Sequence, residues 1–393
     1  MFLTERLAPW GRKDRRHGGG VYRRGLLLDG ERQSAGARAA RLPEGNQQRL
    51  PQFLSQSPWN GKALWPHRAE RREHVFPNPV ARIIDDTGFP RKGEHSVGVA
   101  RPHSGTLGKT ANSQIAVSRQ RTDARGSSPP GFRLYLPQVW RDDPARGRAA
   151  GVPEEITFQT NGRLAWAWLE EALAGGRQKP PVVLADASYG EGTAFREELE
   201  ERDLAYALGI SPSLAVWPEP PGGAIPAGNR RGRPTKCVRS GEKKPVSVKA
   251  LALANHKRFP KVTWREGSRG KLASRFRATR VNTAPDGNHG QAPGPEVWWL
   301  VEWPGGGNEP VKYYLCDLPQ DLSLRRLVAT ARGRVEQDDQ QRKEELGLDH
   351  FEGRSGTGWH HHVTMVRWAH LFLRREQKRR MSKSAVDSAA SPT

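Results

Sequence analysis

Short apolar runs separated by turn residues fill the middle of the chain, a pattern typical of β-strands. Three of them, ARIID (81–85), HSVGVA (95–100) and SQIAVS (113–118), are separated by segments that contain Gly, Lys and Pro. Connections of this kind favour neighbouring strands that run antiparallel. The pattern therefore predicts a sheet that begins near residue 81.

The apolar spacing then changes to that of a helix. In EEITFQTNGRLAWAWLEEALAGG (154–176), apolar residues recur along one face. A buried strand at 182–185, a helix at 193–202 and a strand at 205–210 follow. A strand, helix and strand in this order normally build a parallel pair. Residues 79–211 are therefore expected to form the first part of an α/β core with the order β-β-β-α-β-α-β.

The flanking segments have other patterns. Residues 212–318 are rich in Pro and Gly and contain three strand-like runs, which predicts a β-rich insertion. Residues 319–380 return to helices, one from Asp321 or Ser323 to Gly347 and one over 359–378. We expect a disordered tail at 381–393 and a small, basic, helical region for DNA binding at 1–78.

Charge narrows the range of partners. The 393 residues include 64 Lys and Arg against 42 Asp and Glu, a formal net charge of +22. Such an excess suits the binding of phosphates, so nucleic acid is the expected partner; a merely basic protein and an anionic membrane surface remain alternatives. No apolar run reaches the roughly 18 residues of a membrane span. Cys237 and Cys316 have no neighbouring Cys, which argues against a zinc module or a disulfide framework.

Acidic residues stand at three places in this basic chain. Asp85 and Asp86 end the first strand, Asp186 ends the strand after the first helix, and Glu336 lies in the helix that starts near 321. Each alone is more often a turn former, a helix cap or a solvated residue. Together, three carboxylates would make an oxygen site for two Mg²⁺ or Mn²⁺ ions, about 4 Å apart, that can assist an in-line phosphoryl transfer.

Several blocks carry a family resemblance. They are QFLSQSPWN, IIDDTGFPRKGEHSVGVARPHSGTLGKTANSQIAVS, VVLADASYGEGTAFREELEERDL, RGRPTK, TWREGSRG, YYLCDLP and RVEQDDQQRKEELGLDHFEGRSGTGWHHHV. The chain resembles the DDE transposases of bacterial insertion sequences that have a β-rich insertion before the final glutamate. The resemblance implies a ribonuclease H-like, mixed-sheet catalytic core and divalent-metal catalysis on the inverted repeats of a mobile element.

The resemblance also implies roles for individual residues. It assigns Asp86, Asp186 and Glu336 as the catalytic, metal-binding triad. Arg332 and Lys343 match the basic positions that grip DNA phosphates on either side of the glutamate, and Ala329 stands where the family has a tyrosine.

The aspartate doublet allows one ligand. Side chains alternate along a strand, so Asp85 and Asp86 cannot both face one site. The resemblance places the ligand directly before Thr87, which makes Asp86 the metal ligand and Asp85 its neighbour.

Two short motifs leave alternatives open. RGRP contains Arg231 and Arg233, which could enter an A·T-rich minor groove or form a plain basic linker. The three histidines of WHHHV (359–363) point to different sides of a helix, so we expect packing and phosphate contact rather than a metal centre.

Two Arg- and Pro-rich patches, 61–80 and 119–132, lack helical or strand periodicity. They are either frameshifted, decayed segments or ordinary variable loops.

The sequence thus predicts a cytoplasmic, nucleoid-associated DNA transposase. It would cut double-stranded DNA at inverted repeats, join the ends to a target, and act as a homodimer on paired ends. The alternatives are a metal-dependent nuclease without strand transfer and a decayed transposase that only binds DNA.

Overall fold

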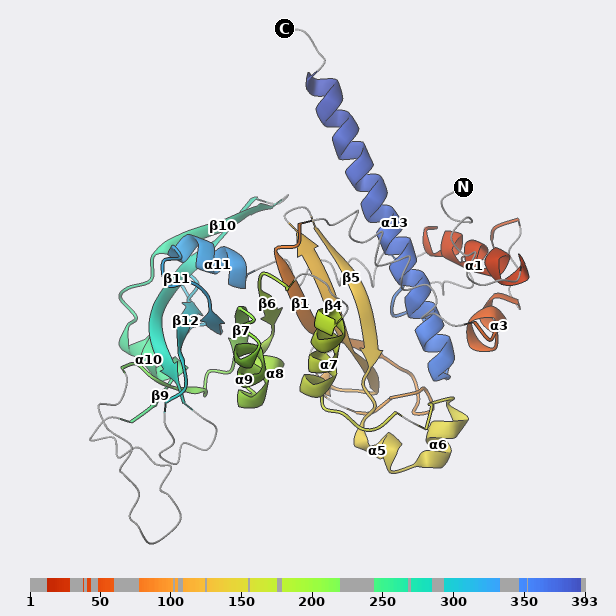
Figure 1. Cartoon of the computed structure of the whole chain (residues 1–393), viewed down its shortest axis with the longest axis horizontal. Helices are drawn as coiled ribbons and strands as arrows, with labels where there is room; N and C mark the ends of the chain where they lie inside the picture. The colour runs from red at the N-terminus through yellow and green to blue at the C-terminus, as the bar shows by residue number, and fades with distance from the viewer. Residues whose placement is uncertain are drawn as a thin grey trace. The chain divides into compact units, whose positions relative to one another are not determined.

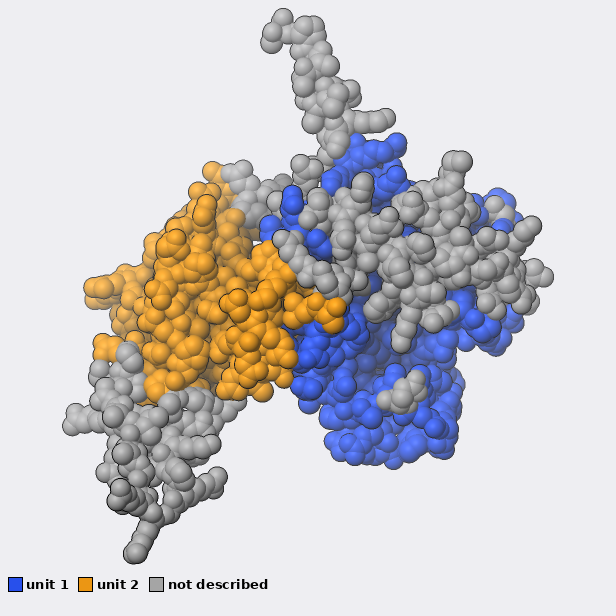
Figure 2. Space-filling model, viewed as in Figure 1, with its two compact units in different colours: residues 1–80, 85–171, 334–393 blue, residues 81–84, 172–333 orange. Residues whose placement is uncertain are grey.

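The computed structural model of the chain (Figure 1) comprises two compact units (Figure 2). Unit 1 contains residues 1–80, 85–171 and 334–393, and unit 2 contains residues 81–84 and 172–333. The structure describes residues 13–28, 38, 41–43, 49–59, 78–101, 103–104, 109–123, 126–154, 156–174, 179–219, 244–267, 270–284, 293–332, 346–351 and 353–389.

Most strands belong to one large mixed sheet. The strands are β1 (Ala81–Pro90), β2 (His103–Ser104), β3 (Lys109–Thr110), β4 (Ser113–Asp123), β5 (Gly126–Leu134), β6 (Val183–Ala185), β7 (Tyr206–Ile210), β8 (Ala215–Trp217), β9 (Val246–Ser247), β10 (Lys261–Gly267), β11 (Gly270–Thr283), β12 (Glu296–Glu302) and β13 (Lys312–Asp317). The order in the sheet is β5-β4-β1-β6-β7-β13-β12-β11-β8-β9, with β10 paired to β11 and with β2 and β3 forming a separate ribbon.

Helices connect these strands and flank them in the sequence. They are α1 (Lys13–Leu26), α3 (Arg49–Ser55), α5 (Gln138–Arg141), α6 (Pro144–Ala149), α7 (Asn161–Ala174), α8 (Ala187–Gly190), α9 (Thr193–Glu201), α10 (Val248–Ala254), α11 (Leu324–Ala331) and α13 (Gly356–Ala389). No helix in the described ranges is both long and apolar enough to cross a membrane.

The predicted α/β class with a mixed sheet is confirmed. Strands β4 and β5 are antiparallel, whereas β1, β6 and β7 pair in parallel. All five residues of β7, YALGI, are buried, as expected for a strand covered on both faces. Helices α7 and α9 follow the predicted order.

Three local expectations were wrong. Residues 95–100 form turns with a single bridge from Ala100 to Ser113 rather than a strand. Helix α7 begins at Asn161, well after Glu154, because Thr160 caps it: its Oγ1 accepts the Arg163 N–H at 3.3 Å. The described residues of the patch 119–132 belong to the paired strands β4 and β5, where a decayed segment or a variable loop was expected.

The described residues of 212–318 are β-rich as predicted, and several of their strands continue the core sheet. The last of these strands, β13, pairs antiparallel with β7, where Leu315 lies opposite Leu208. Strands β12 and β11 then extend the sheet. Without β13, the backbone N–H and C=O groups along one edge of β7 would have no partners in the sheet. Pairing with β13 satisfies these groups, which is favourable. Unit 2 therefore joins the insertion to β6 and β7, across the domain boundary expected at residue 212.

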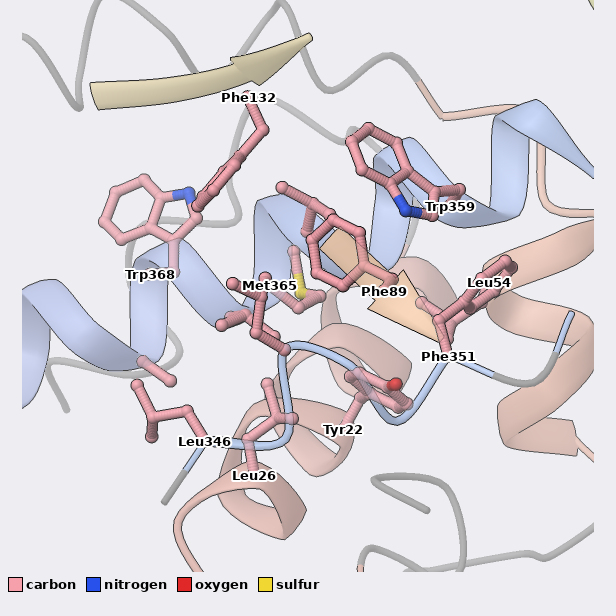
Figure 3. Close-up of a cluster of buried hydrophobic side chains, with 14 of the residues drawn as sticks. Tyr22, Leu26, Leu54, Phe89, Phe132, Leu346, Phe351, Trp359, Met365 and Trp368 are labelled. Atoms are coloured by element: carbon pink, nitrogen blue, oxygen red, sulfur yellow. The ribbon is translucent and has the colours of Figure 1, made fainter. Parts of the chain in front are cut away.

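The N-terminal helices also lie within a larger unit. In Figure 3, Tyr22 and Leu26 of α1 lie in one apolar cluster with Leu346, Phe351 and Met365. The cluster explains why unit 1 contains the N-terminal region that the sequence assigned to a separate domain.

Two histidines of WHHHV, in α13, contact the N-terminal part of the chain. Nδ1 and Nε2 of His361 lie 2.7 and 2.8 Å from the carbonyl oxygens of Leu54 and Trp59, and its ring stacks on Trp59. The Tyr22 hydroxyl lies 2.8 Å from Nδ1 of His362. His361 and His362 are buried in packing, as predicted, while His360 is exposed.

We expect His362 to make unit 1 sensitive to acid. Burial lowers the pKa of His362 from 6.5 to about 3, against the opposing effect of carbonyl acceptors at Gly347 and Leu348. Below pH 6.5 His362 is protonated in the unfolded chain but stays neutral in the folded chain. The free energy of unfolding therefore falls as the pH drops towards 3. From pH 7.5 to 5 the loss should be about 2 kcal/mol.

Urea unfolding at the two pH values, compared between wild type and His362→Gln, measures this loss. Between pH 7.5 and 5, the free energy of unfolding should fall by about 2 kcal/mol less in the variant than in wild type. His360→Gln, at the exposed neighbour, should keep the wild-type dependence. Equal pH dependence in wild type and His362→Gln would contradict the assignment.

The last helix is longer than predicted. α13 begins at Gly356 and continues to Ala389, past Lys378, where the sequence predicted its end. Residues 381–389 of the tail that was expected to be disordered are thus helical. The first half of α13 is largely buried, since Trp359, Val366 and Trp368 are almost inaccessible to solvent.

Candidate active site

Two parallel strands carry the first two candidate acids. Strands β1 and β6 pair in parallel, with Ile84 opposite Ala185. Asp86 follows Ile84 by two residues, and Asp186 follows Ala185 directly. Asp85 and Asp86 do not end β1, as the sequence predicted, because β1 continues to Pro90. The acids therefore occur where the chain leaves the paired part of two neighbouring parallel strands, a common location for functional groups in α/β proteins.

Asp86 is held by a neutral donor. Its side chain is partly buried, and Nδ2 of Asn161, at the start of α7, donates to Oδ2 of Asp86 at 2.5 Å. Such a bond orients the carboxylate without adding a positive charge. Asn161 was missed in the sequence because an Asn near a helix start usually indicates a cap.

Asp85 has a different environment. Its Oδ1 accepts the backbone N–H of Asp86 at 2.9 Å, and its carbonyl oxygen accepts the Ser118 hydroxyl at 3.2 Å. The two members of the doublet therefore have different hydrogen-bond partners. This difference is compatible with the sequence-based division into one ligand and one neighbour, which stays a prediction.

Asp186 is an exposed helix cap. Its Oδ1 accepts the N–H of Ser188 at 3.0 Å and the Ser188 hydroxyl at 2.6 Å, which starts the short helix α8. The capping role considered for a lone aspartate is thus present. Since both bonds involve Oδ1, they orient the carboxylate and still leave Oδ2 for other contacts.

Glycines bring α8 close to β7. A Cβ on Gly190 would overlap the carbonyl oxygen of Gly209 and lie 2.8 Å from Cβ of Leu208. A Cβ on Gly209 would lie 2.9 Å from the nitrogen of Ala187. The turn that follows Asp186 is therefore positioned by direct backbone packing, for which only glycine is small enough.

Arg332 has an internal partner. It follows α11, and its Nε lies 3.3 Å from Oε2 of Glu302, which is only 5% exposed. Its guanidinium also lies 5.3 Å from the centre of the Trp264 ring. The sequence signal for Glu302 was an acid inside the otherwise apolar run VWWLVEW. Contact between Arg332 and DNA stays a prediction.

Four of the predicted site residues belong to segments outside the described ranges. They are Glu336, Lys343, Arg231 and Arg233. Among the residues that are described, no group of three His, Cys, Asp or Glu side chains could hold a metal ion. Asp86 and Asp186 still fit a divalent cation chemically, because carboxylate oxygens are the ligands that Mg²⁺ and Mn²⁺ favour.

Similar proteins supply independent information. The NurA nuclease from Sulfolobus solfataricus aligns over 84% of this chain and 96% of its own, at 10% identity and a TM-score of 0.26. A TM-score this low supports no conclusion. A probable transposase for insertion sequence element IS701 from Microchaete diplosiphon is 34% identical over 167 residues.

The match to the transposase is partial: it covers 42% of this chain and 41% of the relative, less than half of either protein. The DDE superfamily endonuclease family matches residues 6–271, a span that includes Asp86, Asp186 and most of the described core. This match extends over more than half of the sequence, and the chain therefore belongs to the DDE superfamily endonucleases.

Proposed function

We propose that the protein is the DNA transposase of an insertion sequence, which cuts DNA at terminal inverted repeats and joins the ends to a target. The pairing of β1 with β6 carries the proposal, because it aligns the strands that lead to Asp86 and Asp186. The similarity to a probable insertion-sequence transposase supports the substrate class. The net charge of +22 favours a polyanionic partner.

The proposed triad is Asp86, Asp186 and Glu336. Bound Mg²⁺ or Mn²⁺ ions, two in number, would activate the attacking oxygen and stabilise the leaving oxygen of a phosphoryl transfer. Asp86, oriented by Asn161, and Asp186, oriented by Ser188, would contribute carboxylate oxygens to these ions. Arg332, Lys343, Arg231 and Arg233 would contact DNA phosphates or grooves.

The proposed DNA substrate also suggests how the protein assembles and where it acts. Two DNA ends must be joined together, so we propose a homodimer that binds paired ends. The protein would act in the cytoplasm, on the DNA of the nucleoid.

One assay tests the proposal against its alternatives. Purified protein is incubated with DNA that ends in the element's inverted repeat, with Mg²⁺ or Mn²⁺, beside Asp186→Asn. We expect cut and joined products from wild type and neither product from the variant. Cuts without joining would indicate a nuclease, and a gel shift without metal-dependent cutting would indicate a protein that only binds DNA. Equal cutting by the variant would exclude Asp186 from the triad.

A further inference from the structure

The start of α7 contains a residue whose side chain reaches the aspartate of β1. Nδ2 of Asn161 donates to Oδ2 of Asp86 at 2.5 Å, although 75 residues separate the two in the chain. We propose that Asn161 is a positioning residue, which orients the Asp86 carboxylate for a divalent cation; this inference rests on the metal-binding role proposed for Asp86.

The ordinary role of an Asn at a helix start is already filled. Thr160 caps α7, because its Oγ1 accepts the Arg163 N–H at 3.3 Å and its carbonyl oxygen accepts the Leu164 N–H at 3.0 Å. The amide of Asn161 instead bonds to Asp86. Helix capping therefore does not account for Asn161, whereas orientation of Asp86 does.

A neutral donor suits a cation site better than a charged one. The terminal torsion of an Asp side chain has a broad, roughly two-fold preference, so a fixed donor is needed to hold the plane of the carboxylate. A Lys or Arg in this place would offset the negative charge that attracts the cation. The amide of Asn161 fixes Oδ2 and leaves the charge of the carboxylate unchanged.

Helix α7 is firmly attached to the hairpin of β4 and β5, which gives Asn161 a stable position. Trp168 of α7 is 1% exposed, and the guanidinium groups of Arg119 and Arg133 lie 4.6 and 4.5 Å from its ring centre. Arg119 also donates to the carbonyl oxygen of Trp168. On β5, a Cβ at Gly131 would overlap the Trp168 ring, so the absence of a side chain permits this contact.

The hydrogen-bonding capacity of Asn161 is consistent with this role. Within the described part of the chain, its Oδ1 is buried and has no hydrogen-bond partner. A residue selected only for local stability would be expected to satisfy both polar atoms. In Asn161, Nδ2 donates to Asp86, and Oδ1 could accept a hydrogen bond from a water or another donor near the cation.

The test measures binding of the metal alone and cutting separately, on the full chain. Binding of Mn²⁺ without DNA is measured by calorimetry for wild type, Asp86→Asn, Asn161→Ala, Asn161→Leu and Thr160→Ala. The leucine keeps the approximate shape of Asn161 without its polar atoms, so it separates loss of the donor from loss of packing. Thr160→Ala is the matched control, since it removes the cap and keeps the Asn161 amide.

We expect both Asn161 variants to weaken Mn²⁺ binding by about 10- to 100-fold, the range typical for residues that orient a metal ligand. The Mg²⁺ concentration for half-maximal cutting should rise in parallel. Thr160→Ala should leave both quantities within about 3-fold of wild type. A purely structural role would instead make the Thr160 and Asn161 variants alike.

Each outcome separates the inference from the proposed function. Wild-type Mn²⁺ binding in both Asn161 variants, with weakened binding in Asp86→Asn, would overturn the role of Asn161 alone. Unchanged binding in Asp86→Asn would overturn both the metal role of Asp86 and the inference. If the Asp86 and Asn161 variants both lose Mn²⁺ but wild type cuts no DNA, the inference stands and the proposed activity fails.

Discussion

Asp86→Asn should reduce metal-dependent DNA cutting on the order of 10³-fold or more, whereas Asp85→Asn should retain most of it. If Asp86 is a metal ligand, the substitution removes a negatively charged ligand from a cation that would stabilise the transition state by several kcal/mol. Each 1.36 kcal/mol is a factor of ten in rate. Asp85 makes a different contact: its Oδ1 accepts the backbone N–H of Asp86 at 2.9 Å.

The two substitutions are closely matched. Both replace Asp by Asn in adjacent positions of the same strand, and the amide oxygen of an Asn at 85 can still accept the Asp86 N–H. Single-turnover cutting of end-labelled DNA with saturating Mg²⁺ measures the rates. The reverse order of activities would assign the ligand role to Asp85, and two fully active variants would remove β1 from the site.

Gly190→Ala should destabilise unit 2 by about 3 kcal/mol, at the upper end of the cost of overpacking a core. The added Cβ would overlap the Gly209 carbonyl oxygen of β7 and press on Leu208. Backbone atoms of a central strand cannot move aside as a flexible side chain can. Helix α8 would therefore shift, and Asp186, which caps it, would shift too.

Urea unfolding followed by tryptophan fluorescence measures the loss of stability. Gly192→Ala is the control two residues away, where the nearest atom to an added Cβ is the Tyr189 carbonyl oxygen at an ordinary 3.7 Å. We expect Gly192→Ala to stay within about 1 kcal/mol of wild type. Equal stability of the two variants would show that α8 packs less closely on β7 than the structure indicates.

Local pattern predicted the elements well where side-chain periodicity was strong. The runs at 81–85, 113–118 and 205–210 became β1, β4 and β7, and the helix at 193–202 became α9. The prediction of a strand at 95–100 was wrong. Gly98 has a φ of 71°, which interrupts an extended strand, and the segment forms turns. Local pattern also failed at 119–132, because the strong charge of the patch concealed a hairpin whose arginines pack on Trp168.

Of the candidate site, the sequence pointed to Asp86 and Asp186 but not to the groups that orient them. An acid beside an apolar run is visible in the sequence, because it interrupts that run. Asn161 contacts Asp86, and Glu302 contacts Arg332, only through the fold. Local periodicity does not encode a contact such as that between Asn161 and Asp86, which are 75 residues apart.

The sequence by itself determined the α/β class, most of the order of strands and helices, the basic charge and the acids that interrupt or follow two apolar runs. Each of these depends on composition or on spacing between near neighbours. Only the tertiary structure decided that the insertion extends the core sheet through β7, that α1 packs with α13, and that Asn161 orients Asp86. Those outcomes depend on which edges and apolar faces remain unpaired once the elements have formed, and distant segments compete for them.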